Sequence, residues 1–153
     1  MSLTSLLPEA RQLLEEQGYH GHQALCDLLR HDVAHYDWVG FYWMNDAAQT
    51  LHLGAYAGAS TDHDVIPYGR GICGQVAVSG NTFEVPNVQA QDNYLSCSVD
   101  TRSEIVVPIY HDHQLIGQLD IDSHVLDPFS PEDHDVLGQI CEWVAQLARP
   151  VGY

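Results

Sequence analysis

The sequence predicts an α+β domain in which helices from both ends of the chain cover an antiparallel sheet. Apolar residues recur at helical spacing near the two ends, and they alternate with a period of two between about residues 38 and 123. With 153 residues, 45% of them apolar, the chain can bury one core without a disulfide or a structural metal. No linker or repeat interrupts it, so we expect a single domain.

Two helices are predicted within residues 8–36. The break between them falls near Gly18–Gly21, because glycines weaken a helix. The second helix has an apolar face made by Ala24, Leu25, Leu28, Leu29 and Val33. Cys26 on this helix and Cys141 near the other end of the chain lie on apolar helix faces, so we expect both to be small core residues.

Strands are predicted after Trp38, where the apolar period changes to two. A hairpin should form around Asn45–Ala48, whose polar and small residues favour a turn. The expected elements in order are strands Val39–Trp43 and Thr50–Tyr56, an edge strand Val65–Pro67, a short helix Gly71–Ser79, a strand over residues 82–88, and a long loop over residues 89–101 that holds Cys97.

The last predicted hairpin decides which acidic side chains lie together. One face should pack on the core, because six apolar residues of the two strands are all odd-numbered: Ile105, Val107, Ile109, Leu115, Leu119 and Ile121. A three-residue turn at Asp112–Gln114 would pair residues of equal parity across the two strands. The even-numbered face then gathers Glu104, Asp120 and Asp122, with side-chain bases about 5 to 8 Å apart.

Three carboxylates at this spacing repel one another unless a cation, a proton or a ligand amine lies among them. This arrangement favours a binding site. The other interpretation is that Asp120 and Asp122 form the solvated side of an exposed strand.

The chain is predicted to close with a helix that begins at Ser130. A serine cap, a proline at the first helical position and two acids in the first turn are typical of a helix start. The apolar residues that follow at helical spacing are Val136, Leu137, Ile140, Val144 and Leu147. This helix and the two N-terminal helices would cover the apolar face of the sheet.

The charge of the chain excludes several classes of partner and chemistry. It has 21 acidic residues against five basic ones, all arginine, and a formal charge of −16. Such a surface repels phosphate, so we expect no nucleic acid and no membrane as partner. Without lysine, Schiff-base chemistry and a Walker-type phosphate loop are ruled out. No apolar run or signal-peptide pattern is found, so we expect a cytoplasmic protein with reduced thiols.

The ten histidines do not predict a metal site. His31 and His35 are four residues apart on a predicted helix, but no third ligand is placed near them, so a solvated pair is expected. Cys73 and Cys97 lack the short spacing of common zinc sites. Two other pairs of histidines are expected at the surface: His20 with His22 in the helix break, and His111 with His113 in a turn.

Two cysteines are candidates for thiol chemistry. A thiolate can attack an electrophilic centre when a nearby acid supplies a proton, and a second thiol can then reset it. Cys97, in a polar loop, has the stronger claim to reactivity. For Cys73, which follows the glycines of Gly69–Gly74, a buried structural role and a redox role both stay open.

Several segments with matching mutual spacing carry a family resemblance: Trp38–Tyr42, Gly69–Gly74, a cysteine seven residues before Glu104, and Leu119–Ser123. From Trp38 to the final helix the chain resembles a GAF domain, and it is similar to the free methionine-(R)-sulfoxide reductases of that superfamily. The resemblance implies one GAF domain over residues 1–153, with N-terminal helices in 1–36, sheet and pocket in 38–125, and a C-terminal helix in 130–149. The ligand pocket would lie on the sheet face opposite the helices.

The resemblance also implies an activity, the reduction of the free amino acid methionine-(R)-sulfoxide. Implied site residues are Cys97 as the nucleophile, the acids Glu104, Asp120 and Asp122 for the amine and the sulfoxide oxygen, and Trp38 and Tyr42 as walls for the methyl group. No cofactor would be bound. A thioredoxin-type protein would supply electrons from outside, and the chain could form a homodimer.

One departure from the family pattern leaves two hypotheses open. Family members commonly carry a third cysteine ten residues before Cys73, and here His63 takes that place. In the first hypothesis Cys73 itself condenses with a sulfenic acid on Cys97, and the chain is an enzyme. In the second the chain is a non-catalytic GAF module that binds a small molecule or senses redox state.

Overall fold

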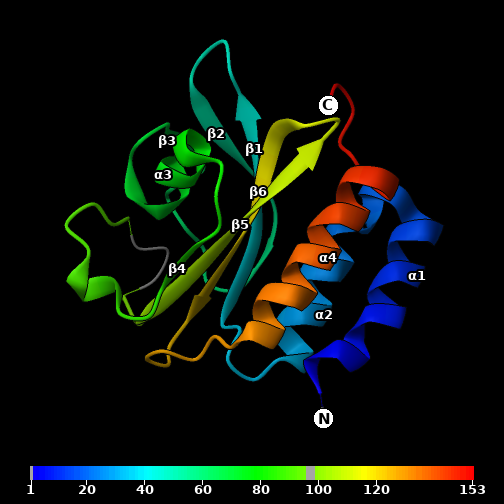
Figure 1. Cartoon of the computed structure of the whole chain (residues 1–153), viewed down its shortest axis with the longest axis horizontal. Helices are drawn as coiled ribbons and strands as arrows, with labels where there is room; N and C mark the ends of the chain where they lie inside the picture. Colours follow the sequence, from blue (N-terminus) through cyan, green and yellow to red (C-terminus); the bar gives the residue numbers. More distant parts are fainter. Residues whose placement is uncertain (1, 96–98) are drawn as a thin grey trace.

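The protein consists of one antiparallel sheet with helices on both faces (Figure 1). The computed structural model describes residues 2–95 and 99–153. The strands are β1 (Trp38–Asn45), β2 (Thr50–Ala57), β3 (Val65–Pro67), β4 (Phe83–Val85), β5 (Ser103–His111) and β6 (Gln114–Ser123). Their order across the sheet is β3-β2-β1-β6-β5-β4, so β1 and β6 lie at its centre.

Three long helices cover one face of the sheet, and one short helix covers the other (Figure 1). The long helices are α1 (Leu7–Gln17), α2 (His22–Asp32) and α4 (Pro131–Leu147), and the short one is α3 (Gly71–Ser79). Short 3-10 turns occur at Leu3–Leu6, Gly18–Gly21 and Val88–Ala90. The α+β class, the helix break and the start of the last helix are confirmed. None of the helices in the described ranges has the length and hydrophobicity needed to cross a membrane.

The main hydrophobic core lies between the long helices and the sheet. Ile105, Leu119 and Ile121 point to this side and are fully buried. Cys26 and Cys141 lie in the same core, where burial raises the pKa of both thiols well above its ordinary value. Both cysteines are therefore core residues, as predicted.

The β5–β6 hairpin differs from the prediction at its tip. The turn has two residues, Asp112 and His113, with φ angles of 50° and 65°. The register shifts by one residue between Ile109 and Tyr110, because a bulge adds Ile116 to β6. The predicted three-residue turn is therefore wrong.

The bulge changes the face of one residue and preserves the faces of the others. Ile116 packs in the helix-side core, whereas Leu115 packs on the opposite face, so the placement of Leu115 in that core was wrong. Between the bulge and the open end of the hairpin, paired residues are both odd-numbered or both even-numbered, as Ile105 and Ile121 are. The even-numbered acids therefore share one face, as predicted.

The fourth strand is shorter than the predicted 82–88, since pairing stops at Val85 just before Pro86. Two histidines also differ from expectation. His22 is buried against Phe41 and Trp43, and its Nε2 lies 2.6 Å from the carbonyl oxygen of Ala148.

His35 is not a solvated partner of His31. Its Nε2 lies 2.7 Å from Oδ1 of Asp133 in the first turn of α4, whereas the side chain of His31 is 88% exposed. The α2–β1 connection and the start of α4 are thus joined by a charged hydrogen bond.

Candidate active site

Three acidic side chains lie on the sheet face opposite the long helices. Glu104 on β5 is paired with Asp122 on β6, and Asp120 is two residues before Asp122 on the same strand. Their exposed fractions are 2%, 1% and 0%, respectively. The acids are therefore buried, which rules out the interpretation of Asp120 and Asp122 as a solvated strand face.

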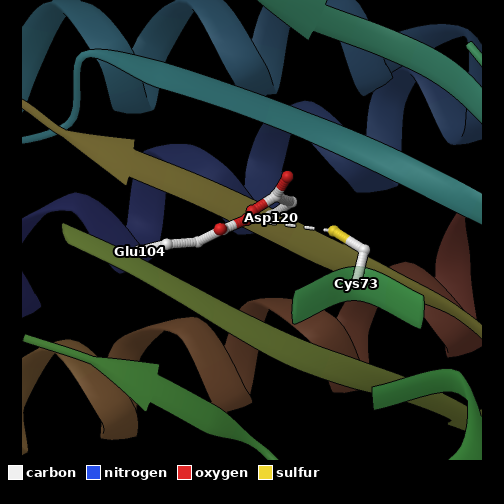
Figure 2. Close-up of side chains that lie close together, drawn as sticks. All are labelled: Cys73, Glu104 and Asp120. Atoms are coloured by element: carbon white, nitrogen blue, oxygen red, sulfur yellow. Dashed lines mark hydrogen bonds between the residues drawn. The ribbon is translucent and has the colours of Figure 1, made fainter. Parts of the chain in front are cut away.

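The thiol of Cys73 lies beside two of these acids (Figure 2). Its Sγ is 3.9 Å from Oε2 of Glu104, and the Cys73 sulfur and one oxygen each of Glu104 and Asp120 all lie within 4.8 Å of one another. Cys73 comes from α3 above the sheet, whereas the acids come from β5 and β6. Residues distant in the sequence therefore form one buried thiol–carboxyl cluster, Cys73–Glu104–Asp120.

Burial raises the pKa of Asp120, and the neighbouring Glu104 and Cys73 lower it by less. Neither carboxylate oxygen of Asp120 has a hydrogen-bond partner of good geometry among the described residues. Two carboxyl groups this close in a buried site cannot both carry a charge cheaply. The cluster can therefore hold a proton, or it can receive a cation.

The backbone of α3 is fixed to the sheet and to the turn that precedes it. Gln118 on β6 is buried and donates from Nε2 to the carbonyl oxygen of Cys73 at 3.1 Å. Gly74 is needed for close approach, because a Cβ at this position would lie 2.7 Å from the carbonyl oxygen of Pro67. The glycines of Gly69–Gly74 thus allow the helix to place Cys73 over the acids.

Asn93 connects the long loop to the same turn. Its Oδ1 accepts from the backbone N–H of Gly71 at 2.7 Å, and its Nδ2 donates to the carbonyl oxygen of Gly69 at 2.7 Å. The sequence analysis missed both Asn93 and Gln118. For Gln118 a signal existed, since it precedes Asp120 and Asp122 on the same even-numbered face. Cys97, the predicted nucleophile, lies outside the described residues.

Trp38 and Tyr42 belong to the same face of the sheet as the acids. Trp38 is paired with Asp122 across β1 and β6, and Gly40 is paired with Asp120. A Cβ on Gly40 would lie 2.4 Å from the indole ring of Trp38, so the absence of a side chain lets this ring lie across the strand. Both aromatic side chains are buried.

Hydrogen bonds fix both aromatic rings to the β2–β3 connection. Trp38 donates from Nε1 to the carbonyl oxygen of Ala59 at 3.0 Å, and it stacks on Tyr56 with ring centroids 5.4 Å apart. Tyr42 donates from its hydroxyl to the carbonyl oxygen of His63 at 2.7 Å.

A cavity of about 10 Å³ opens at the thiol–carboxyl cluster, close to the smallest space that holds one water molecule. Its polar lining comes from His63, Arg70, Cys73, Glu104 and Asp120. The structure thus brings Cys73, Glu104 and Asp120 together. Trp38, Tyr42 and Asp122 lie around this group on the same sheet face.

Comparison with known proteins identifies the family of this fold. The family model for the GAF domain matches residues 23–147. The chain is 37% identical over 122 residues to a free methionine-R-sulfoxide reductase of Escherichia coli, covering 80% of this chain and 70% of that protein.

Solved structures are similar over nearly the whole chain. A free methionine-R-sulfoxide reductase from Neisseria meningitidis, in complex with its substrate, superposes with a TM-score of 0.87 at 32% identity, covering 94% of this chain and 86% of that one. A substrate complex of the Staphylococcus aureus protein gives a TM-score of 0.85 at 30% identity, covering 95% of each chain. On its sheet order, its pocket face and these similarities, the chain belongs to the GAF domain family.

Proposed function

We infer that this protein is an enzyme that reduces free methionine-(R)-sulfoxide to methionine with thiols. The observation that carries the inference is the buried cluster in which Cys73, Glu104 and Asp120 lie within 4.8 Å of one another. It occurs on a chain that is 37% identical to a free methionine-R-sulfoxide reductase. A thiol beside carboxyl groups that can hold a proton is what reduction of a sulfoxide requires.

In the proposed first step the Cys97 thiolate attacks the sulfoxide sulfur. A carboxyl group of Glu104 or Asp120 donates a proton to the sulfoxide oxygen, and the S–O bond breaks as the oxygen is transferred to Cys97. Methionine is released, and the cysteine becomes a sulfenic acid. The substrate sulfur gains two electrons, and the cysteine sulfur loses two.

In the second step the Cys73 thiol condenses with this sulfenic acid, which forms a Cys73–Cys97 disulfide and releases water. A thioredoxin-type dithiol then reduces the disulfide and is itself oxidised. No bound cofactor is required. The reaction suits the cytoplasm, where such reductants keep thiols reduced.

The acids and aromatic rings provide the specificity. The ammonium group of a free amino acid would lie among Glu104, Asp120 and Asp122, whose buried charges favour a cation. Trp38 and Tyr42 would contact the methyl end. Because the cavity is about 10 Å³, lining side chains such as Leu95 must move apart when an amino acid enters.

A non-catalytic GAF module is the second candidate. One observation favours it, since His63 lines the cavity at the place where family members commonly carry a third cysteine. Such a protein would bind the same small amino acid without turnover.

A coupled thioredoxin assay with purified substrates separates the two candidates. We expect reduction of free methionine-(R)-sulfoxide, with poor rates on the S epimer and on the N-acetylated R epimer, which lacks the ammonium group. Binding of the R epimer without methionine formation would assign the second candidate. Equal rates on the N-acetylated compound would contradict the role given to the acids.

Cysteine variants test the mechanism. Cys97→Ser should abolish methionine formation even in a single turnover, and Cys73→Ser should permit one turnover but stop cycling with thioredoxin. Cys26→Ala, which removes a core thiol, is the control and should cycle normally. A Cys73→Ser enzyme that cycles normally would show that another group resolves the intermediate.

A further inference from the structure

We propose that the same cavity binds a divalent metal ion of the zinc class through Cys73, Glu104 and Asp120, with His63 as the fourth donor. Metal binding would be a second property of the same pocket residues. It goes beyond the reductase function, because it does not require turnover.

The donor atoms are already close to a metal-binding arrangement. A sulfur atom and two carboxylate oxygens lie within 4.8 Å of one another on three different elements, α3, β5 and β6. Tetrahedral zinc, with bonds of about 2.0 to 2.3 Å, places its ligands about 3.3 to 3.8 Å apart. Side-chain shifts of about 1 Å would therefore close the set around one ion, and Figure 2 shows these side chains directed toward a common point.

The surroundings of Asp120 are a second observation that favours a cation. Its side chain is fully buried, lines the cavity, and offers two oxygens that have no hydrogen-bond partner of good geometry among the described residues. A buried carboxylate whose close polar neighbours are another carboxyl group and a thiol is costly when charged, and metal coordination is one of the ways in which proteins satisfy it. The cavity of about 10 Å³ also fits an occupant the size of one ion or one water molecule.

The chemistry of the donors favours a borderline metal. His63 lines the same cavity, is half-buried, and has its carbonyl oxygen held by the hydroxyl of Tyr42; its ring nitrogens are not among the donor atoms within 4.8 Å of one another, so the ring would turn toward the ion. Thiolate and imidazole ligands select zinc or a neighbouring transition metal over magnesium or calcium, which prefer oxygen alone. On binding, the Cys73 thiol would release its proton to solvent, and one divalent ion would offset two of the three negative charges of the thiolate and the two carboxylates.

Metal binding and reductase chemistry would exclude each other. A metal-bound Cys73 thiolate cannot condense with a sulfenic acid, and the same acids cannot hold an ammonium group. The metal would thus inhibit reduction and protect the thiol from oxidation.

The test uses the reduced 153-residue chain carrying Cys97→Ser, which removes the proposed nucleophile and leaves Cys73 in the cluster. After treatment with a chelator, Zn²⁺ is titrated against a chromophoric chelator. Co²⁺ is added separately to detect the intense near-ultraviolet absorption of a thiolate-bound cobalt ion. We expect one equivalent to bind, with cobalt–thiolate absorption and a rise in melting temperature in excess Zn²⁺.

Single substitutions in this background locate the site. Cys73→Ser should abolish the cobalt–thiolate absorption, and Asp120→Asn and His63→Asn should each weaken Zn²⁺ binding by about 10-fold or more. Asp62→Asn and His113→Asn alter exposed residues and serve as matched controls that keep the affinity. The melting temperature without metal checks that each variant is folded.

The proposal is overturned if Cys73→Ser and Asp120→Asn bind Zn²⁺ as tightly as the two controls, or if His63→Asn leaves the affinity unchanged. Because Cys97→Ser has no expected turnover, metal binding is measured independently of activity. Zinc binding in a wild-type protein that fails the thioredoxin assay would support this site while the reductase function fails. A wild-type protein that is active in the thioredoxin assay but binds no Zn²⁺ would overturn the metal site and support the reductase function.

Discussion

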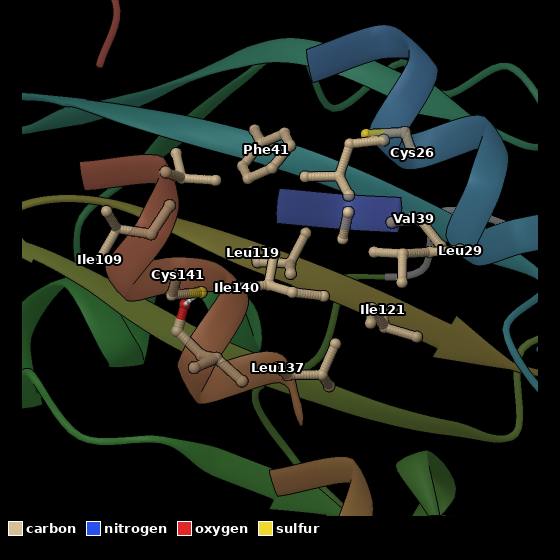
Figure 3. Packing of buried hydrophobic residues seen from close by; sticks show 14 of the residues in the cluster. Cys26, Leu29, Val39, Phe41, Ile109, Leu119, Ile121, Leu137, Ile140 and Cys141 are labelled. Atoms are coloured by element: carbon tan, nitrogen blue, oxygen red, sulfur yellow. Dashed lines mark hydrogen bonds between the residues drawn. The ribbon is translucent and has the colours of Figure 1, made fainter. Parts of the chain in front are cut away.

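The two faces of β6 show opposite solutions to burial. Ile121 and Leu119 point to the long helices, where apolar side chains from both layers interdigitate (Figure 3). Asp120 and Asp122 alternate with them on the same strand and are just as buried, but they face α3 and the cavity side. Consecutive residues on one strand thus lie in an apolar core and in a carboxylate cluster.

The comparison separates what holds the fold from what the site needs. Apolar area buried under the helices stabilises the fold by about 25 cal/mol per Å². Buried carboxylates oppose folding unless a proton, a cation or a ligand compensates them. A protein retains such a cost where function requires it, so the two faces should respond differently to substitution.

The largest expected effect is on the helix side. Ile121→Ala should lower the free energy of unfolding by about 2 to 5 kcal/mol, because it leaves a cavity in a fully packed layer. Ile121→Val, which removes one methyl group, should cost about 0.5 to 1.5 kcal/mol. Urea denaturation of both variants checks this. Equal losses would show that the layer collapses around the smaller side chain.

The second-largest effect on the free energy of unfolding should come from Asp133, a charged side chain with several hydrogen bonds. Burial would raise the pKa of Asp133, but hydrogen bonds from His35, Tyr36 and Ser130 outweigh it and hold the pKa well below its usual range. Asp133→Asn should therefore cost about 1.5 to 3 kcal/mol near pH 7.

The pH dependence of this cost has a definite sign. A lowered pKa contributes stability that is present above the unfolded value, near about 3.9, and is lost as the pH falls through the folded value. The difference between wild type and Asp133→Asn should therefore shrink from pH 7 toward pH 2 in denaturation experiments. A constant difference would mean that packing, and not charge, supplies the effect.

A smaller effect should come from His22 under the helices. Burial lowers its pKa, and the hydrogen bond to Ala148 raises it by less. The neutral form is therefore favoured in the folded protein, and stability is lost as the pH falls below the unfolded value of about 6.5, by at most about 1.4 kcal/mol per pH unit. His22→Gln should flatten the stability profile between pH 7 and 5, whereas exposed His20→Gln should not.

The smallest change in stability is expected on the pocket side. Asp120→Asn removes a buried charge with little change in volume, so the free energy of unfolding should stay the same or rise by up to about 1 kcal/mol. Catalytic efficiency should fall by about 10- to 100-fold if the acid contacts the substrate. A melting temperature several degrees lower, with unchanged kinetics, would mean that Asp120 supports the fold.

The sequence predicted the two faces because strict alternation leaves few choices in a paired strand. Ile105 and Ile121 are both odd-numbered and share one face. Their even-numbered neighbours Glu104, Asp120 and Asp122 therefore had to share the other face. The tip was not predictable in the same way, since a three-residue turn and a two-residue turn with a bulge give the same parity. Leu115 was misplaced for that reason.

Contacts between distant backbone and side-chain groups could not be predicted. Asn93 holds a turn 22 and 24 residues earlier in the chain, and Gln118 contacts a carbonyl 45 residues away. Neither contact leaves a local pattern. His22 likewise lies at a helix start that suggests exposure, and only the tertiary packing of Phe41 and Trp43 buries it.

The single extra residue at Ile116 has an effect well beyond the hairpin tip. If Ile116 were paired opposite Ile109 and no bulge formed, the two-residue turn would put Asp120 opposite Ile105, on the side of the long helices, and every following side chain of β6 would change sides. The side chains that line the pocket therefore depend on which face each residue of β6 takes, and the bulge near the turn determines this. Deleting Ile116 would remove the bulge and leave Gly117 opposite Ile109, so the acids would keep their face, whereas an added residue that paired in register would exchange the apolar and acidic surfaces of the strand.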